Sequence, residues 1–72
     1  MDHKTLSMFA HLSQTLHFGK TAQAYHISPS TLSRAIKRLE DEVGGELLHR
    51  DNRTVALTDT GKKFKIYAEQ QL

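Results

Sequence analysis

The chain has 72 residues, of which 38% are hydrophobic, no cysteine, and a formal net charge of +2. A chain this short forms one domain with a small core, and the lack of cysteine excludes a disulfide framework and a thiolate metal site. No apolar run approaches the roughly 18 residues of a membrane span, and no secretory signal opens the chain. We therefore expect a cytoplasmic protein with no membrane partner.

The charges are unevenly distributed along the chain. Residues 1–36 carry a net charge of +2, residues 37–49 carry −2, and residues 50–65 carry +3. Two basic zones therefore flank an acidic one, which predicts a polarised surface. The acidic zone contains Glu40, Asp41, Glu42 and Glu46. We interpret it as a solvated helix end and not as a catalytic acid/base pair.

A first helix is predicted after Asp2, which is a suitable N-cap. Its apolar side follows helical spacing through Leu6, Phe9, Leu12, Ser13 and Leu16. The segment 17–19 interrupts this pattern, with Gly19 suited to a left-handed helix end and Phe18 to a core anchor between helices. A short second helix should then run from residue 20 or 21 to about residue 25.

Residues 28–44 form the best-defined helix. Ser28 is a good N-cap, Pro29 suits the first helical position, and Gly44 supplies the stop. Its buried stripe is predicted to consist of Leu32, Ile36, Leu39 and Val43. Two short helices joined by a short turn indicate a helix-turn-helix.

The other face of this helix carries small hydroxyl groups followed by basic groups. Its members are Ser30, Thr31, Ser33, Arg34, Lys37 and Arg38. Hydroxyl groups permit a close approach to a surface, and the basic groups reach phosphates or base edges. The alternative is an ordinary amphipathic helix with a solvated charged face.

A short β-hairpin is predicted next, with residues 47–50 and 54–57 as its arms and residues 51–53 near its tip. Arg50 and Arg53 would project from this loop. Beside a helix-turn-helix, such a loop would touch the DNA backbone or minor groove. The alternative is a solvated turn with two incidental arginines.

Thr58 is predicted to cap a last helix, and Gly61 early in that helix suggests a close backbone contact. The apolar side of this helix exposes more surface than a small domain needs, which favours a dimerising helix. Its dimerisation residues would be Phe64, Tyr67, Ala68 and Leu72. The alternative is a helix that packs back on its own domain.

The predicted fold is therefore mainly α. Residues 1–58 form a winged helix-turn-helix of three helices plus a short hairpin wing, and residues 59–72 begin a linker or dimerisation helix. The five histidines are scattered, with no i,i+4 pair and no obvious carboxylate partner. This pattern argues against an enzyme, a metal site or a cofactor site.

In this order of elements the chain resembles the N-terminal domain of LysR-type transcriptional regulators. The resemblance rests on residues 6–50, on the wing RDNRTVALT and on TDTGKK, and covers nearly the whole chain. Leu48 and Thr60 depart from the phenylalanine and alanine that are usual in the family. The resemblance implies sequence-specific binding of double-stranded operator DNA by a bacterial homodimer, or by a homotetramer in the full-length protein. It also implies a C-terminal effector-binding domain that this chain lacks, so we expect the chain to be part of a longer protein.

The resemblance further implies a set of DNA-contacting residues. The set is Ser28, Pro29, Ser30, Thr31, Ser33, Arg34, Lys37, Arg38, Arg50, Arg53 and Thr58. Ser30, Ser33 and Arg34 would meet base edges in the major groove, with Pro29 and Thr31 setting the approach. Lys37 and Arg38 would meet phosphate.

In the wing, Arg53 would enter the minor groove and Arg50 would lie near the DNA backbone. Thr58 would bind phosphate through its hydroxyl group or act only as an N-cap. The rival interpretation of the whole chain is a helical protein-interaction module whose cationic face binds an acidic partner. That module would bind duplex DNA weakly, without sequence preference and only at low salt.

Overall fold

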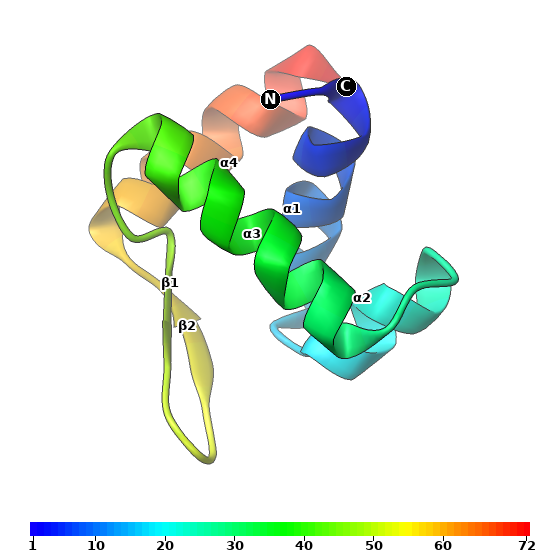
Figure 1. Ribbon diagram of the computed structural model, residues 1–72. Helices are drawn as coiled ribbons and strands as arrows, with labels where there is room; N and C mark the ends of the chain where they lie inside the picture. The colour runs from blue at the N-terminus through cyan, green and yellow to red at the C-terminus, as the bar shows by residue number, and fades with distance from the viewer.

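Four helices and one two-stranded sheet make up the protein (Figure 1). The computed structural model describes all 72 residues. In chain order the elements are α1 (His3–Thr15), α2 (Phe18–Ala24), α3 (Pro29–Val43), β1 (Leu48–Arg50), β2 (Val55–Leu57) and α4 (Asp59–Gln71). The mainly helical winged helix-turn-helix fold is confirmed. None of the helices has the length and apolar character needed to cross a membrane.

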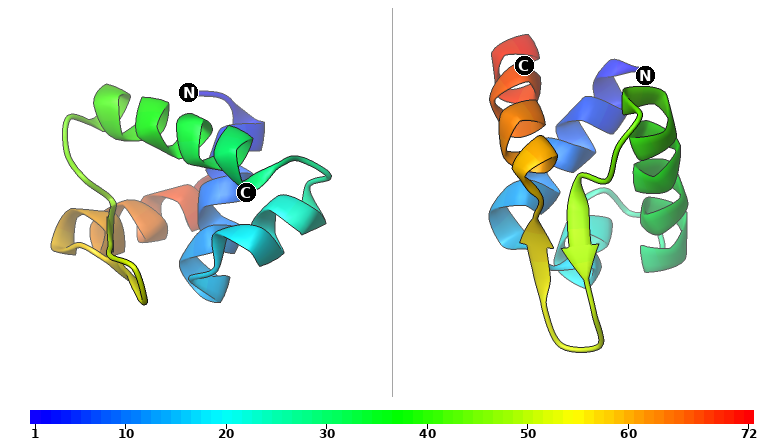
Figure 2. Two further views of the ribbon diagram at one scale, coloured as in Figure 1. Left: turned by 60° about the horizontal axis from the view of Figure 1, so that its bottom comes forward. Right: turned by 90° about the vertical axis from the view of Figure 1, so that its left-hand side faces the viewer.

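Helix α1 lies at the centre of the domain and packs against the other three helices. Phe9 and Leu12 from α1 are fully buried, and so is Leu32 from α3. The ring of Phe64 on α4 meets the ring of Phe9 edge-on, with 5.5 Å between centroids. Both chain termini lie at the end of the domain opposite the tip of the hairpin (Figure 2, right). The core thus holds α3 and the hairpin on a common helical support.

The predicted helix starts are confirmed by their caps. The side chains of Asp2, Ser28 and Thr58 each accept a hydrogen bond from the backbone N–H three residues further on. Such caps satisfy N–H groups that have no partner within the helix. Gly44 ends α3 in the left-handed conformation, with φ of 87°, a region that a residue with a Cβ enters only at a cost.

The end of α1 differs from the prediction. Leu16 takes the left-handed position, with φ of 52°, and its side chain is 38% exposed instead of buried. Helix α2 already begins at Phe18, so Gly19 lies inside that helix. The early start has a local cause: His17 acts as the N-cap, its Nδ1 accepting from the backbone N–H of Lys20 at 3.0 Å.

The hairpin is anchored to α3 by Glu40. Its Oε2 accepts hydrogen bonds from the backbone N–H groups of Leu47, at 2.8 Å, and Leu48, at 3.3 Å. The interpretation of Glu40 as part of a solvated acidic end is therefore wrong, whereas Asp41 and Glu42 are exposed as expected. The carboxylate instead fixes the angle at which the hairpin leaves the helix.

The start of α4 is pressed against the segment before β1. A Cβ added to Gly61 would lie 2.0 Å from the carbonyl oxygen of Leu47, which is a severe clash. The same carbonyl accepts a hydrogen bond from the N–H of Thr58 at 3.1 Å. The close backbone contact predicted for Gly61 is confirmed.

The two strands pair antiparallel, with His49 opposite Ala56. Asp51 holds the loop between them, because its Oδ1 accepts from the backbone N–H groups of Arg53 and Thr54 at 2.8 and 2.9 Å. These backbone bonds lower the pKa of the Asp51 carboxyl group below its ordinary value. The loop is thus an ordered turn that projects away from the helices (Figure 2).

Candidate nucleic-acid interface

The face of α3 opposite its buried stripe is exposed and cationic. Leu32, Ile36 and Leu39 point into the core, as predicted, and Val43 is half-buried. Helical spacing therefore places Ser30, Arg34 and Lys37 on the solvent side, where all three are exposed.

The first turn of α3 is a cluster of hydroxyl groups. The Oγ of Ser28 accepts from the backbone N–H of Thr31 at 3.1 Å and lies 2.9 Å from the Thr31 hydroxyl oxygen. It also lies 3.4 Å from the hydroxyl oxygen of Ser30. Ser28 therefore serves first as the helix cap, while Pro29, Ser30 and Thr31 form the exposed surface at the helix start.

The two basic side chains in the middle of this face are free to bind a ligand. An Nη2 of Arg34 lies 3.4 Å from the hydroxyl oxygen of Thr31, a long contact for a hydrogen bond. Lys37 pairs with Asp41 at 3.9 Å, with the two side chains 69% and 70% exposed. An ion pair this exposed contributes at most about 1 kcal/mol, so phosphate is able to displace it.

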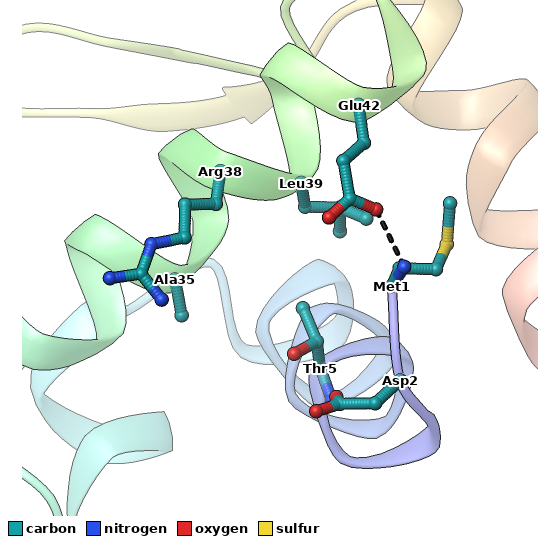
Figure 3. Close-up of a pocket in the computed structure, with 7 residues that line it drawn as sticks. All are labelled: Met1, Asp2, Thr5, Ala35, Arg38, Leu39 and Glu42. Carbon is teal, nitrogen blue, oxygen red and sulfur yellow. Dashed lines mark hydrogen bonds and ion pairs between the residues drawn. The ribbon is translucent and has the colours of Figure 1, made fainter.

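Arg38 lies on a different side of α3, beside the start of α1. It lines a shallow hollow of about 430 Å³ between the two helices (Figure 3). The Met1 amine binds Glu42 there at 2.6 Å, and this hydrogen bond raises the pKa of the amine. The guanidinium group of Arg38 points away from this pair (Figure 3). Arg38 is therefore free to bind a ligand, but it lies beside the exposed cationic face of α3 and not at its centre.

Arg50 does not project from the hairpin loop as predicted. It is the last residue of β1, and its side chain turns back toward α3. One Nη donates to the Oγ of Ser33 at 2.7 Å, and the guanidinium carbon lies 4.4 Å above the ring of Phe18. Phe18 is half-buried and packs against the core, as expected of an anchor. Its second role as a platform for arginine has no local sequence signal, because the two residues are far apart in the chain.

Arg53 occupies the tip of the hairpin as predicted. It is exposed, and its guanidinium group makes no hydrogen bond or ion pair.

A groove of about 540 Å³ runs between the hairpin and the start of α3, lined by Ser30, Ser33 and Arg34 on one side and by Arg50 and Asp51 on the other. The two cationic elements therefore face a common space.

The hydroxyl group of Thr58 is used within the domain. It accepts from the N–H of Gly61 at 2.9 Å and donates its single proton to the carbonyl oxygen of Glu46. A phosphate oxygen needs a donor, and this hydroxyl has no second proton to offer. Of the two predicted roles, the structure supports the N-cap and not the phosphate contact.

The predicted dimerisation residues differ in exposure. Ala68 is fully buried against the domain's own core, so it offers no surface to a second copy. Phe64 is half-buried beside α1, whereas Tyr67 and Leu72 are 46% and 52% exposed. Ile66, which the prediction omitted, is 60% exposed. One side of α4 therefore packs back on its own domain, as one alternative predicted, and another side remains exposed.

No group of three histidine, aspartate or glutamate side chains is arranged to hold a metal ion. The geometry is instead that of a surface for a polyanion, with hydroxyl and cationic groups on a helix and on an adjacent hairpin.

The family model described as "Bacterial regulatory helix-turn-helix protein, lysR family" matches residues 3–62. The chain belongs to the LysR family. This LysR-family domain is 51% identical over 72 residues to the transcriptional activator IlvY of Salmonella typhimurium. It is 54% identical over 71 residues to IlvY of Haemophilus influenzae. The alignments cover 100% and 99% of the chain but only 24% of each relative, so the chain spans about a quarter of their length.

The similarity to IlvY agrees with a narrower resemblance in the sequence. The segments HISPSTLSRAIKRLE and RDNRTVALT resemble the regulator of acetohydroxy acid isomeroreductase, an enzyme of branched-chain amino-acid synthesis. These relatives are named as a transcriptional activator and a transcriptional regulator, which agrees with the prediction that this chain is not an enzyme.

Solved structures share the fold of this LysR-family domain. The BenM DBD in complex with catB site 1 DNA superposes with a TM-score of 0.91 at 35% identity, covering 99% of this chain and 79% of that one. Vibrio fischeri DarR in complex with DNA superposes with a TM-score of 0.92 at 34% identity, covering 99% of this chain and 24% of that one. At 35% and 34% identity, these two structures are similar to this chain in sequence as well as in fold.

Proposed function

We propose that this chain binds double-stranded operator DNA sequence-specifically, as the N-terminal domain of a bacterial LysR-type transcriptional regulator. The N-terminal half of α3 enters the major groove. The hairpin wing, residues 50–54, contacts the DNA backbone or the minor groove. The observation that carries the proposal is the shared groove between the exposed hydroxyl and cationic face of α3 and the wing. Solved relatives in complex with DNA support it.

Each exposed residue of α3 has a distinct part in this proposal. Ser30, Ser33 and Arg34 meet base edges, and a bidentate contact from Arg34 to guanine supplies about 1–3 kcal/mol of discrimination. Pro29 and Thr31 set the approach of the helix. Lys37 and Arg38 bind phosphate, which sets affinity and its salt dependence but carries no sequence information.

In the wing, Arg53 has a free guanidinium group at the tip and is the residue proposed for the minor groove. A narrow minor groove has an enhanced negative potential that attracts arginine. Ser28 acts indirectly, because it caps the helix start that approaches the DNA backbone.

The parent protein is proposed to act in the cytoplasm as a homodimer. The exposed apolar side chains of Ile66 and Tyr67 on α4, and of Leu72 directly after it, are the surface on this chain that a second copy would cover. A two-fold pair of α3 helices would then read a partly palindromic operator. Any small-molecule effector would act through a C-terminal domain of the parent.

The test is a selection from a pool of random duplexes, followed by titration of the selected duplex against a scrambled one over a range of salt concentrations. The proposal predicts a preference for the selected duplex that survives physiological salt. Equal binding to both duplexes, lost as salt rises, would instead identify a basic helical module whose natural partner is an acidic protein.

A further inference from the structure

A hydrogen bond joins the wing to α3. It connects the guanidinium group of Arg50 to the hydroxyl group of Ser33, one of the residues proposed to contact bases. Arg50 starts on β1, crosses the ring of Phe18 and ends with an Nη 2.7 Å from the Oγ of Ser33. Ser33 is half-buried at this point, whereas its neighbours Ser30 and Arg34 are exposed. Three elements, α2, α3 and β1, are therefore joined through one arginine side chain.

This contact decides what Ser33 is able to do. A guanidinium group has only donors and stays protonated in proteins, so the serine oxygen must be the acceptor in this bond. One lone pair of the hydroxyl is then occupied while its proton is free to point elsewhere. The adjacent positive charge polarises the hydroxyl, which strengthens it as a donor and opposes the approach of a second donor.

The stacking on Phe18 makes the arrangement directional. A planar cation 4.4 Å above an aromatic ring gains an attraction of its own, and Phe18 is itself held by the core. The guanidinium group is thus aimed at Ser33 and away from the outer edge of the wing, where Arg53 is free.

We propose that Arg50 is a specificity-positioning residue, which holds Ser33 as a hydrogen-bond donor so that the base under Ser33 is read through an acceptor atom. The acceptors are the ring nitrogen or oxygen of a purine edge, or the oxygen of thymine, and the amino group of cytosine is disfavoured. This inference rests on the proposed function and specifies it at one contact. It also gives the two wing arginines different tasks: Arg53 contacts DNA, and Arg50 acts through Ser33.

The experiment compares Arg50→Met, Ser33→Ala and the double variant with the unaltered chain on a set of duplexes mutated at one base pair at a time. Methionine keeps an unbranched side chain over Phe18 but removes the donors. Ser33→Ala should lower the preference at one base pair about threefold to tenfold, the range expected for one hydrogen bond. Arg50→Met should lower the preference at that same base pair, and the double variant should be no worse there than Ser33→Ala alone.

Arg53→Met is the matched control, because it removes the same charge from the same wing. It should leave the preference at the Ser33-dependent base pair intact. A uniform loss of affinity in Arg50→Met, with a smaller salt slope and an unchanged base preference, would overturn the inference and make Arg50 a phosphate contact.

Arg50→Lys separates position from charge. It should keep the charge of the wing but not the full base preference, because an ammonium group lacks the planar geometry that lies on Phe18. Full recovery of the preference with lysine would contradict the positioning role.

Base analogues test the direction of the hydrogen bond. Removing the acceptor atom from the selected base should weaken binding of the unaltered chain but not of Ser33→Ala. Weaker binding on removal of a cytosine amino group would mean that Ser33 accepts, which overturns the inference. If the unaltered chain shows no base preference at all, the proposed function fails together with this inference, whereas a preserved preference that ignores Arg50 defeats the inference alone.

Discussion

Replacing Gly61 by alanine should destabilise the domain, although the same change in an ordinary helix is stabilising. A helix with alanine at an interior position is more stable than one with glycine there by about 1 kcal/mol. At Gly61, however, the added methyl carbon would lie 2.0 Å from the Leu47 carbonyl oxygen and 2.9 Å from its carbonyl carbon. Both neighbours are backbone atoms, so no rotamer change relieves the clash.

The cost follows from what the Leu47 backbone already does. Its carbonyl accepts from Thr58, and its N–H donates to Glu40. Moving it strains both bonds and the buried Leu47 side chain. Overpacking of this kind costs about 1–3 kcal/mol, and disturbing the adjacent N-cap adds about 1 kcal/mol. After subtracting the gain of about 1 kcal/mol in helix propensity, we expect a net loss of about 1–3 kcal/mol, which lowers the melting temperature of a domain this size by roughly 5–25 °C.

Thermal and urea denaturation of the variant, followed by circular dichroism, measure this loss. Gly45→Ala is the control, because a Cβ at Gly45 meets only the Cγ2 of Thr60 at an ordinary 3.7 Å, and its stability should stay within about 0.5 kcal/mol of the unaltered chain. A melting temperature of Gly61→Ala equal to or above that of Gly45→Ala would refute the reasoning.

Three further predictions concern the interface and the wing. Arg34→Ala should flatten base preference at one position by about 1–3 kcal/mol, whereas Lys37→Ala should weaken binding to all duplexes alike and reduce the salt slope by about one; titration of both variants on single-base duplexes distinguishes these outcomes. Glu40→Ala should cost about 1–3 kcal/mol of stability, because two backbone N–H groups at the wing lose their acceptor, and denaturant titration against Asp41→Ala measures it. Since the pKa of Asp51 is lowered in the folded state, its contribution should be present above the unfolded pKa of about 3.9 and fade as the pH falls through the folded value. Asp51→Asn should remove this acid dependence of unfolding, and a dependence equal to that of the unaltered chain would contradict the assignment.

The elements whose limits are set by adjacent residues were predictable from the sequence. Helix α3 begins and ends where Ser28, Pro29 and Gly44 predicted, because cap and stop act within one turn of the chain. The end of α1 was not predictable in this way. There Leu16 adopts a left-handed conformation and His17 serves as a cap, and neither residue type favours that position.

The candidate interface was predictable as a set of exposed side chains but not in its internal contacts. The periodicity of α3 places Arg34 and Lys37 on its exposed face, and the turn places Arg53 at the wing tip. The inward turn of Arg50 depends on Phe18, which comes close only once α2 and the wing have both packed against the core. A contact of this kind between distant segments has no period or motif by which a single sequence reveals it.

Long-range contacts also determine the spacing of the two elements proposed to bind DNA, α3 and the wing. Leu47 is the residue at which they are joined: its side chain is fully buried, its N–H is held by α3 through Glu40, and its carbonyl is held by the start of α4. Leu47 therefore ties the wing to both α3 and the start of α4, and the packing of α3 and α4 on α1 sets the rest of their arrangement. If α4 carries the dimer contact, the separation of two α3 helices in the dimer is transmitted through this joint. Gly61 then matters for more than stability, since the close approach that it permits contributes to where the second half-site would lie.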